Sequence, residues 1–80
     1  MHLVILTPDK ELFHGKVTSV NVPAVDGRFE VLKGHAPIVA ALGKGEVRYQ
    51  PAKGEKQSLQ IEQGFIEVLR DEISLLVTGI

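Results

Sequence analysis

The three histidines are the side chains of this sequence best suited to hold a metal ion or to move a proton near neutral pH. His2, His14 and His35 show no metal-ligand spacing, and the chain has no cysteine to join them. We therefore predict no metal site from this pattern. A small metal-dependent enzyme stays an alternative, which requires the three imidazoles to converge in the folded chain and which metal titration would test.

The other groups with catalytic potential also lack the neighbours that catalysis needs. Ser19, Ser58 and Ser74 lie in strand-like runs and not in a Gly-x-Ser-x-Gly turn. The Gly-Lys pairs in residues 43–45 and 53–54 are too short for a phosphate-binding loop. The carboxylates occur singly, as they do on a solvated strand face. We expect no catalytic residue and no cofactor, and a role in binding.

The most distinctive pattern lies in residues 25–42. It opens with Asp26-Gly27, a dipeptide typical of a two-residue hairpin turn in which both residues have φ > 0. Phe29 and Val31 then alternate with polar positions, which indicates a strand. The Gly-His-Ala-Pro sequence of residues 34–37 predicts a rigid corner, because Gly permits an unusual φ and Pro keeps the preceding residue extended. By itself this pattern more often marks only a hairpin and a corner in a small β domain.

Short runs of alternating apolar and polar residues follow one another along the whole chain. Ile73, Leu75 and Val77 recur at every second position, for example, and no segment shows sustained 3.6-residue periodicity. The nearly continuous apolar run from His2 to Leu6 predicts a strand covered on both faces. We expect turns at residues 7–9, at Gly15, and at residues 43–45, 51–56, 63–64 and 70–71. This spacing predicts one all-β domain over residues 1–80, a small flattened β-sandwich or barrel of about eight to ten short strands.

Composition narrows the classes of partner. The chain has 80 residues and a net charge of −1, which argues against nucleic acid, since nucleic acid requires a basic patch. No apolar run approaches the roughly 20 residues of a membrane span, so we expect no direct membrane insertion. A domain of this size buries only about 60% of its unfolded surface. It therefore has reason to depend on a partner.

The pattern of residues 25–42 resembles the N-terminal β-sandwich domain of the epsilon subunit of F-type ATP synthases. The specific part is Gly27 and Phe29 followed by the Gly-His-Ala-Pro corner of residues 34–37. Residues 2–7 are similar to the opening strand of that family, and residues 64–68 to its last hairpin. The resemblance covers essentially the full chain.

The resemblance implies a non-catalytic subunit of the central stalk of a proton- or sodium-translocating ATP synthase, at the cytoplasmic face of the bacterial inner membrane. Its partners would be the gamma subunit and the c subunits of the rotor ring, without an obligate homo-oligomer. A rigid sandwich would transmit torque between them. The positions that match the gamma-facing side of the family are Thr7, His35, Ala40 and Glu67. The positions that match the turn facing the ring are Asp26, Gly27, Arg28 and Phe29.

Three positions depart from the family pattern. Arg28 stands where an acidic or small polar residue is usual, Glu30 where Gly is usual, and Lys33 where Pro is usual. Because a guanidinium group donates hydrogen bonds in a fixed fork, we expect Arg28 to bind acidic or carbonyl groups of the ring loops. Most members also continue into a C-terminal pair of helices, which this sequence does not contain. We therefore expect the inhibitory and nucleotide-binding roles of those helices not to carry over.

Alternatives remain at single residues and for the whole chain. Glu67 interrupts the apolar run of residues 65–69, as either a solvated position of an alternating strand or a contact residue. His35 either pins the corner through a backbone hydrogen bond or contacts a partner. A sugar-binding module would need exposed aromatic rings on one face, and it fits poorly because the chain has only Tyr49 and three Phe, most of which the core requires. A structural adaptor of an unrelated assembly fits the composition equally well.

Overall fold

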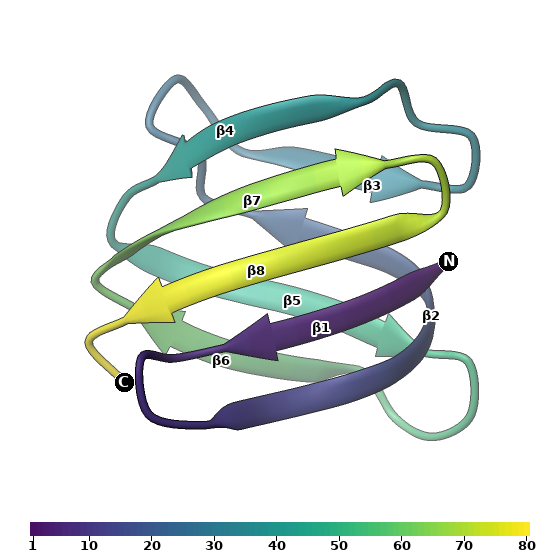
Figure 1. Cartoon of the computed structure of the whole chain (residues 1–80), viewed down its shortest axis with the longest axis horizontal. Helices are drawn as coiled ribbons and strands as arrows, with labels where there is room; N and C mark the ends of the chain where they lie inside the picture. Colours follow the sequence, from purple (N-terminus) through teal and green to yellow (C-terminus); the bar gives the residue numbers. More distant parts are fainter.

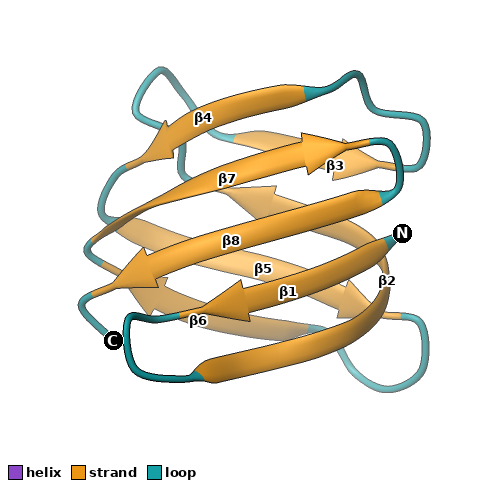
Figure 2. Ribbon diagram, viewed as in Figure 1, coloured by secondary structure: helices purple, strands orange, loops and turns teal.

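The chain forms eight β-strands and no helix in a computed structural model that describes all 80 residues (Figure 1, Figure 2). The all-β prediction for residues 1–80 is confirmed. Of the expected turns, that at residues 70–71 separates two strands, and those at 43–45 and 51–56 are each one residue shorter than expected, because Gly45 and Pro51 belong to β5. The strands are β1 (His2–Leu6), β2 (Glu11–Val22), β3 (Phe29–Leu32), β4 (Ile38–Leu42), β5 (Gly45–Pro51), β6 (Gln57–Ile61), β7 (Gln63–Leu69) and β8 (Glu72–Thr78).

Two layers share one strand. The strands β4, β7, β8, β1 and the first part of β2 form the near layer of Figure 1, and β3, the second part of β2, β5 and β6 form the far layer. All neighbours run antiparallel except β1 and β8, which are parallel and pair Leu3 with Ile73. The strand β2 passes from the near layer to the far one, so the backbone hydrogen bonds of a single strand tie the two layers together.

The prediction of a turn at Gly15 is wrong. Gly15 lies inside β2 and pairs with Leu3 of β1, and further along the strand Ser19 pairs with Gln50 of β5. The pairing of β2 with β5 shifts register between Val17 and Ser19, which is where a strand bends as it changes layers. Pairing with partners distant in sequence keeps the chain extended through a glycine that local propensity would place in a turn.

The predicted turn at Gln63-Gly64 is likewise displaced. Both residues belong to β7, and Gly64 pairs with Leu42 of β4 and Val77 of β8. A Cβ at Gly64 would overlap the carbonyl oxygen of Leu76, so this glycine allows β8 to approach closely. The chain turns one residue earlier, at Glu62, whose backbone N–H donates to the Thr78 carbonyl at 2.9 Å.

A single apolar core fills the space between the layers. All buried polar side-chain atoms have hydrogen-bond partners, and no polar residue is itself buried. The core residues come from every strand: Leu3, Ile5, Val17, Val20, Val22, Val31, Leu42, Val47, Ile61, Ile66, Val68, Ile73, Leu75 and Val77. Period-two alternation therefore directs one face of each strand inward, as the sequence predicts.

Strand β1 is covered on one face only, contrary to the expectation from its apolar run. Leu3 and Ile5 are fully buried, whereas His2, Val4 and Leu6 are half-buried. The layer has no third layer stacked on its outside, so the second face of β1 belongs to the outer surface (Figure 1).

The adjacent pair Leu75 and Leu76 tests this division of faces. Leu75 is 0% exposed and Leu76 is 53% exposed, on opposite sides of β8. We expect Leu75→Ala to lower the free energy of unfolding by about 2–5 kcal/mol, because it leaves a cavity, and Leu76→Ala to change it by about 0.5 kcal/mol or less. Urea denaturation measures both. If Leu75→Ala does not fold, Ile66→Val should still cost about 1 kcal/mol, and equal effects of the two leucine variants would contradict the assignment of faces.

Candidate interaction surfaces

The outer side of β4, β7 and β8 carries an unusual amount of apolar surface. Its exposed residues are Val39 at 69%, Phe65 at 57%, Leu69 at 55% and Leu76 at 53%. The strand register places them side by side, with Phe65 opposite Leu76 and Glu67 opposite Val39. We call this surface, formed by Val39, Phe65, Glu67, Leu69 and Leu76, the apolar face. Contiguous apolar surface on a small domain marks a site of contact with another molecule.

Glu67 lies in the middle of the apolar face. It is exposed, as strand alternation predicts, and its cross-strand neighbours are Val39 and Ser74. Phe65 and Leu69 flank it along the same side of β7. A partner covering this face would desolvate the carboxylate, so a contact there needs a donor opposite Glu67.

Ala40 does not share that face. Its side chain packs against the core, whereas its neighbour Val39 points outward. The sequence analysis did not identify Val39, Phe65, Leu69 and Leu76 as surface residues. Strand β4 and residues 65–69 and 75–77 are apolar in both phases of the alternation, so the sequence alone does not show which phase is buried. The partner strands settle it.

An apolar groove of about 430 Å³ lies next to the apolar face, where β7 begins and β8 ends. Phe65 and Leu76 form part of its wall, and Val25 from the β2–β3 loop contributes another part. The groove therefore connects the apolar face with the loop that the sequence predicts to face the rotor ring.

That loop is not the predicted two-residue hairpin turn. Val22 and Phe29 pair with each other, which leaves residues 23–28 as the connection, and only Gly27 has a positive φ, of 128°. The backbone N–H of Val25 donates to the Ala41 carbonyl at 3.0 Å, and that of Gly43 donates to the Pro23 carbonyl at 2.8 Å. These bonds hold the loop against the end of β4. The sequence could not show this contact, because it joins residues distant along the chain.

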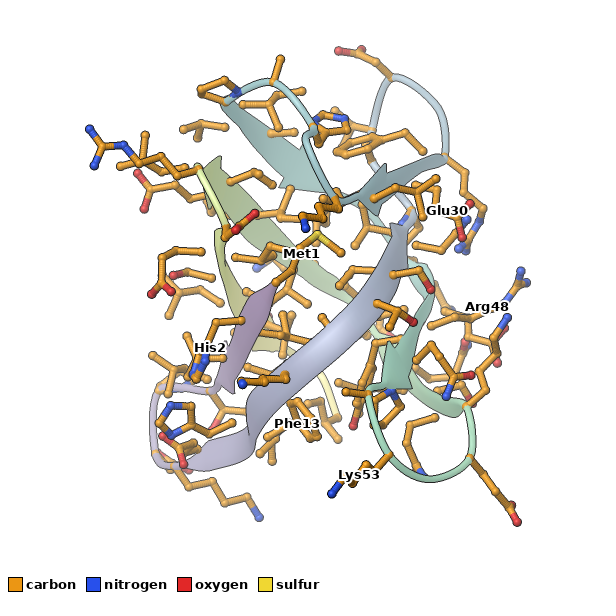
Figure 3. All side chains as sticks on the ribbon, turned by 90° about the vertical axis from the view of Figure 1, so that its right-hand side faces the viewer. Met1, His2, Phe13, Glu30, Arg48 and Lys53 are labelled. Atoms are coloured by element: carbon orange, nitrogen blue, oxygen red, sulfur yellow. The ribbon has the colours of Figure 1, made fainter.

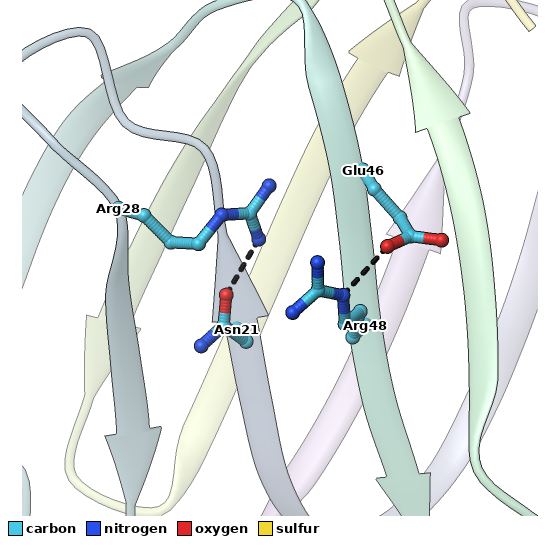
Figure 4. Close-up of polar contacts among 4 residues, drawn as sticks. All are labelled: Asn21, Arg28, Glu46 and Arg48. Carbon is cyan, nitrogen blue, oxygen red and sulfur yellow. Dashed lines mark hydrogen bonds and ion pairs between the residues drawn. The ribbon is translucent and has the colours of Figure 1, made fainter.

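Arg28 folds back over the far layer. Its Nη1 donates to Asn21 Oδ1 at 2.5 Å, and Asn21 pairs with Arg48 in the strand register (Figure 4). Arg48 in turn donates from Nε to Glu46 Oε1 at 2.6 Å. This hydrogen bond is the main reason why the pKa of Glu46 lies below its ordinary value, with weaker contributions from Ser58 and from the Arg28 charge.

His35 pins the corner between β3 and β4. Its Nδ1 lies 2.6 Å from the Ala36 carbonyl oxygen, and its backbone N–H donates to the Leu32 carbonyl at 3.0 Å. Gly34 supplies the left-handed φ of 85° that the corner requires. The ring also stacks on Phe29, with centroids 6.0 Å apart. Thus a residue predicted for the ring side contacts one predicted for the gamma side.

Thr7 lies far from that corner. Its hydroxyl oxygen accepts from the backbone N–H of Lys10 at 3.1 Å and of Asp9 at 3.3 Å, which closes the β1–β2 turn. Figure 1 shows this turn and the β3–β4 corner at opposite ends of the molecule. The four predicted gamma-facing residues therefore do not form one cluster, and their contacts with gamma stay predictions.

No group of three or more His, Cys, Asp or Glu side chains is placed to hold a metal ion together. The chain contains no helix with the length and hydropathy needed to cross a bilayer.

Comparison with known sequences matches this chain to one family, the delta/epsilon chains of ATP synthases. The family model of the β-sandwich domain of ATP synthase delta/epsilon chains matches residues 1–80. The ATP synthase epsilon chain of Chlorobium limicola is 46% identical over 78 residues, which cover 98% of this chain and 89% of that protein. That of Solibacter usitatus (strain Ellin6076) is 41% identical over 76 residues, but the match covers 56% of its length and 95% of this chain.

Solved structures share the fold. One chain of the Euglena gracilis mitochondrial ATP synthase, in a structure of OSCP, F1 and the c-ring, superposes with a TM-score of 0.88 at 23% identity, covering 96% of this chain and 49% of that chain. One chain of the central stalk and c-ring of the Tetrahymena thermophila mitochondrial ATP synthase gives 0.82 at 14% identity, covering 98% and 63%. At these identities the likeness shows the fold alone.

The ion pair on the far layer makes a prediction about pH. Because the pKa of Glu46 is lowered, the pair contributes stability above the ordinary carboxyl range and loses it as pH falls through the lowered pKa. We expect Arg48→Met to raise the pKa of Glu46 more than Arg28→Met does, since the hydrogen bond comes from Arg48. Carboxyl ¹³C NMR titration measures this, and a larger effect of Arg28→Met would contradict the assigned cause.

Proposed function

The chain belongs to the family of ATP synthase delta/epsilon β-sandwich domains, and we propose that it is a non-catalytic subunit of such an enzyme that joins the gamma subunit to the rotor ring. Membership of the family agrees with the resemblance found in residues 25–42. The joining role rests on one observation of the structure, the exposed apolar face around Glu67. The enzyme is a bacterial one driven by protons or sodium ions, and the domain works at the cytoplasmic face of the inner membrane.

The apolar face has the character of a protein–protein contact. Stable interfaces are dominated by a few apolar or aromatic anchors near their centre, and Phe65 and Leu76 lie side by side there. The groove beside them offers a place for an apolar side chain of the partner. We assign this face to gamma, with Glu67 as the charged contact at its centre. On β4 we assign the gamma contact to Val39, which faces outward, and not to Ala40, which packs against the core.

The joining role also requires stiffness, which the shared strand β2 provides. A joint transmits torque only if its two contact surfaces do not move relative to each other. The β2 backbone runs through both layers, and the closely packed core prevents the layers from sliding.

The ring contact is assigned to the β2–β3 loop. Asp26, Gly27 and Arg28 are exposed, and backbone hydrogen bonds hold the neighbouring residues Pro23 and Val25 to the end of β4. This loop is therefore fixed in position even though it is a surface loop. Phe29 is half-buried and stacks on His35, so it anchors the end of the loop and is less available for contact than the three exposed residues.

Binding of gamma should raise the melting temperature of the domain, because a partner that binds only the folded state stabilises it by mass action. At a hundredfold excess over Kd the stabilisation is about 2.7 kcal/mol, which corresponds to roughly 10–20 °C for a domain of this size. We expect Phe65→Ser to abolish this shift, and Leu32→Ser, an equally exposed position on β3 of the far layer, to leave it unchanged. A full shift with Phe65→Ser would exclude the apolar face as the gamma contact.

Contact with the ring should depend on the charge of Arg28. We expect Arg28→Glu to reduce retention of the ring in a pull-down at moderate salt, because it places a carboxylate opposite acidic or carbonyl acceptors. Lys53→Glu, at the β5–β6 turn near the other end of the molecule, is the control for the charge change. Asn21→Ala removes the partner of Arg28 without changing its charge, and should retain the ring. Unchanged retention with Arg28→Glu would refute this contact.

A further inference from the structure

Two of the three histidines meet on the outside of the near layer. His2 pairs with Lys16 across the β1–β2 register and His14 pairs with Val4, so the two histidines are diagonal neighbours on the same face. Their ring centroids are 4.7 Å apart and the rings meet edge to face at 70°. Figure 3 shows His2 on the outside of β1, directed away from the core. No hydrogen bond to the protein occupies either ring.

A carboxylate stands beside this pair. Glu11 Oε2 lies 3.8 Å from His14 Nδ1, and both side chains are more than half exposed. In metal sites a carboxylate next to one nitrogen of a histidine fixes the tautomer and leaves the other nitrogen for the metal. A small shift of either exposed side chain that closes this distance to a hydrogen bond would fix the proton on Nδ1 and leave Nε2 of His14 for the metal. The remaining charged neighbours are Lys16, opposite His2 on β2, and Glu72, opposite His2 on β8.

The spacing of the rings suits a shared ion. Two nitrogen ligands at about 2.0–2.1 Å from a tetrahedral ion are about 3.3 Å apart. Imidazole rings already in contact at 4.7 Å need only small side-chain rotations to present one nitrogen each at that separation. Both side chains are at the surface, so such rotations are unobstructed by the core.

We propose that His2 and His14 form a surface site for a divalent transition-metal ion of the imidazole-binding class, Cu²⁺, Ni²⁺ or Zn²⁺, with Glu11 as a positioning residue. No third His, Cys, Asp or Glu side chain is placed to complete the shell, so water fills the other positions and the bound ion exchanges with solvent. Imidazole ligands favour these ions over Mg²⁺ and Ca²⁺, and Cu²⁺ binds most tightly in this series.

The bound ion would cross-link β1 to β2. These strands are joined by the short turn at residues 7–10, by their backbone ladder and by shared core packing, and no side-chain bond links them on the outer face. An ion held by one side chain from each strand binds the folded state and not the unfolded one, and so stabilises the fold. The site does not use the residues of the proposed joining role, since His2 and His14 lie on β1 and β2 whereas the apolar face lies on β4, β7 and β8.

The test is a titration of the free domain at pH 7.5 with Zn²⁺ by calorimetry and with Ni²⁺ by NMR. We expect one ion per chain, loss of the His2 and His14 ring signals with Ni²⁺, and at least tenfold weaker Zn²⁺ binding in His14→Ala and in His2→Ala. The matched control is His35→Ala, which removes a histidine at the distant corner and should leave the affinity unchanged. Mg²⁺ should not bind.

His14→Ala is the decisive variant, because it removes one proposed ligand and leaves residues 1–2, which include the other, unchanged. It therefore separates a shared site from binding at residues 1–2 alone. If it binds Zn²⁺ as tightly as the parent chain, or if His35→Ala weakens binding equally, the shared site is refuted. Glu11→Gln tests the positioning role: we expect a severalfold loss of affinity together with a changed balance of His14 tautomers in ¹⁵N NMR. An unchanged tautomer balance would remove Glu11 from the site. Binding of gamma in the same variants should be normal, which separates failure here from failure of the proposed function.

Discussion

The pairing of one long strand with both layers is the constraint on which this domain depends. Strand β2 hydrogen-bonds to β1 in the near layer and to β3 and β5 in the far layer. This shared strand brings the inward faces of both layers into register over one core, from Leu3 on one side to Val47 on the other. A chain of this size has little core to spare, so the strand that aligns the layers also determines whether the fold is stable.

The two outer surfaces differ because their strands alternate differently. On the far layer most outward positions are polar or charged, with Leu32 as an exception, and two separate pairs, Arg28 with Asn21 and Arg48 with Glu46, are hydrogen-bonded (Figure 4). On the near layer several outward positions are apolar, and they surround the carboxylate of Glu67. A domain with one solvated face and one apolar face has a defined orientation toward its partner, which a torque-transmitting joint requires.

The segments between strands are fixed more by distant contacts than by their own sequences. The corner at Gly34 follows local chemistry, since its positive φ and the His35 hydrogen bond both come from neighbouring residues. The β2–β3 loop does not, because its conformation depends on backbone bonds to Ala41 and Gly43. This difference explains why the corner was predicted correctly and the two-residue turn was not.

The sequence by itself determined the all-β class, most of the strands and the family, because alternation and turn residues are local signals. It placed Glu67 outward for the same reason. Only the tertiary structure decided that Gly15 and Gly64 lie within strands, that Ala40 faces inward while Val39 faces outward, and that His2 and His14 meet. Each of these depends on which strands become neighbours. That pairing is set by burying one shared core, and no window of the sequence contains it.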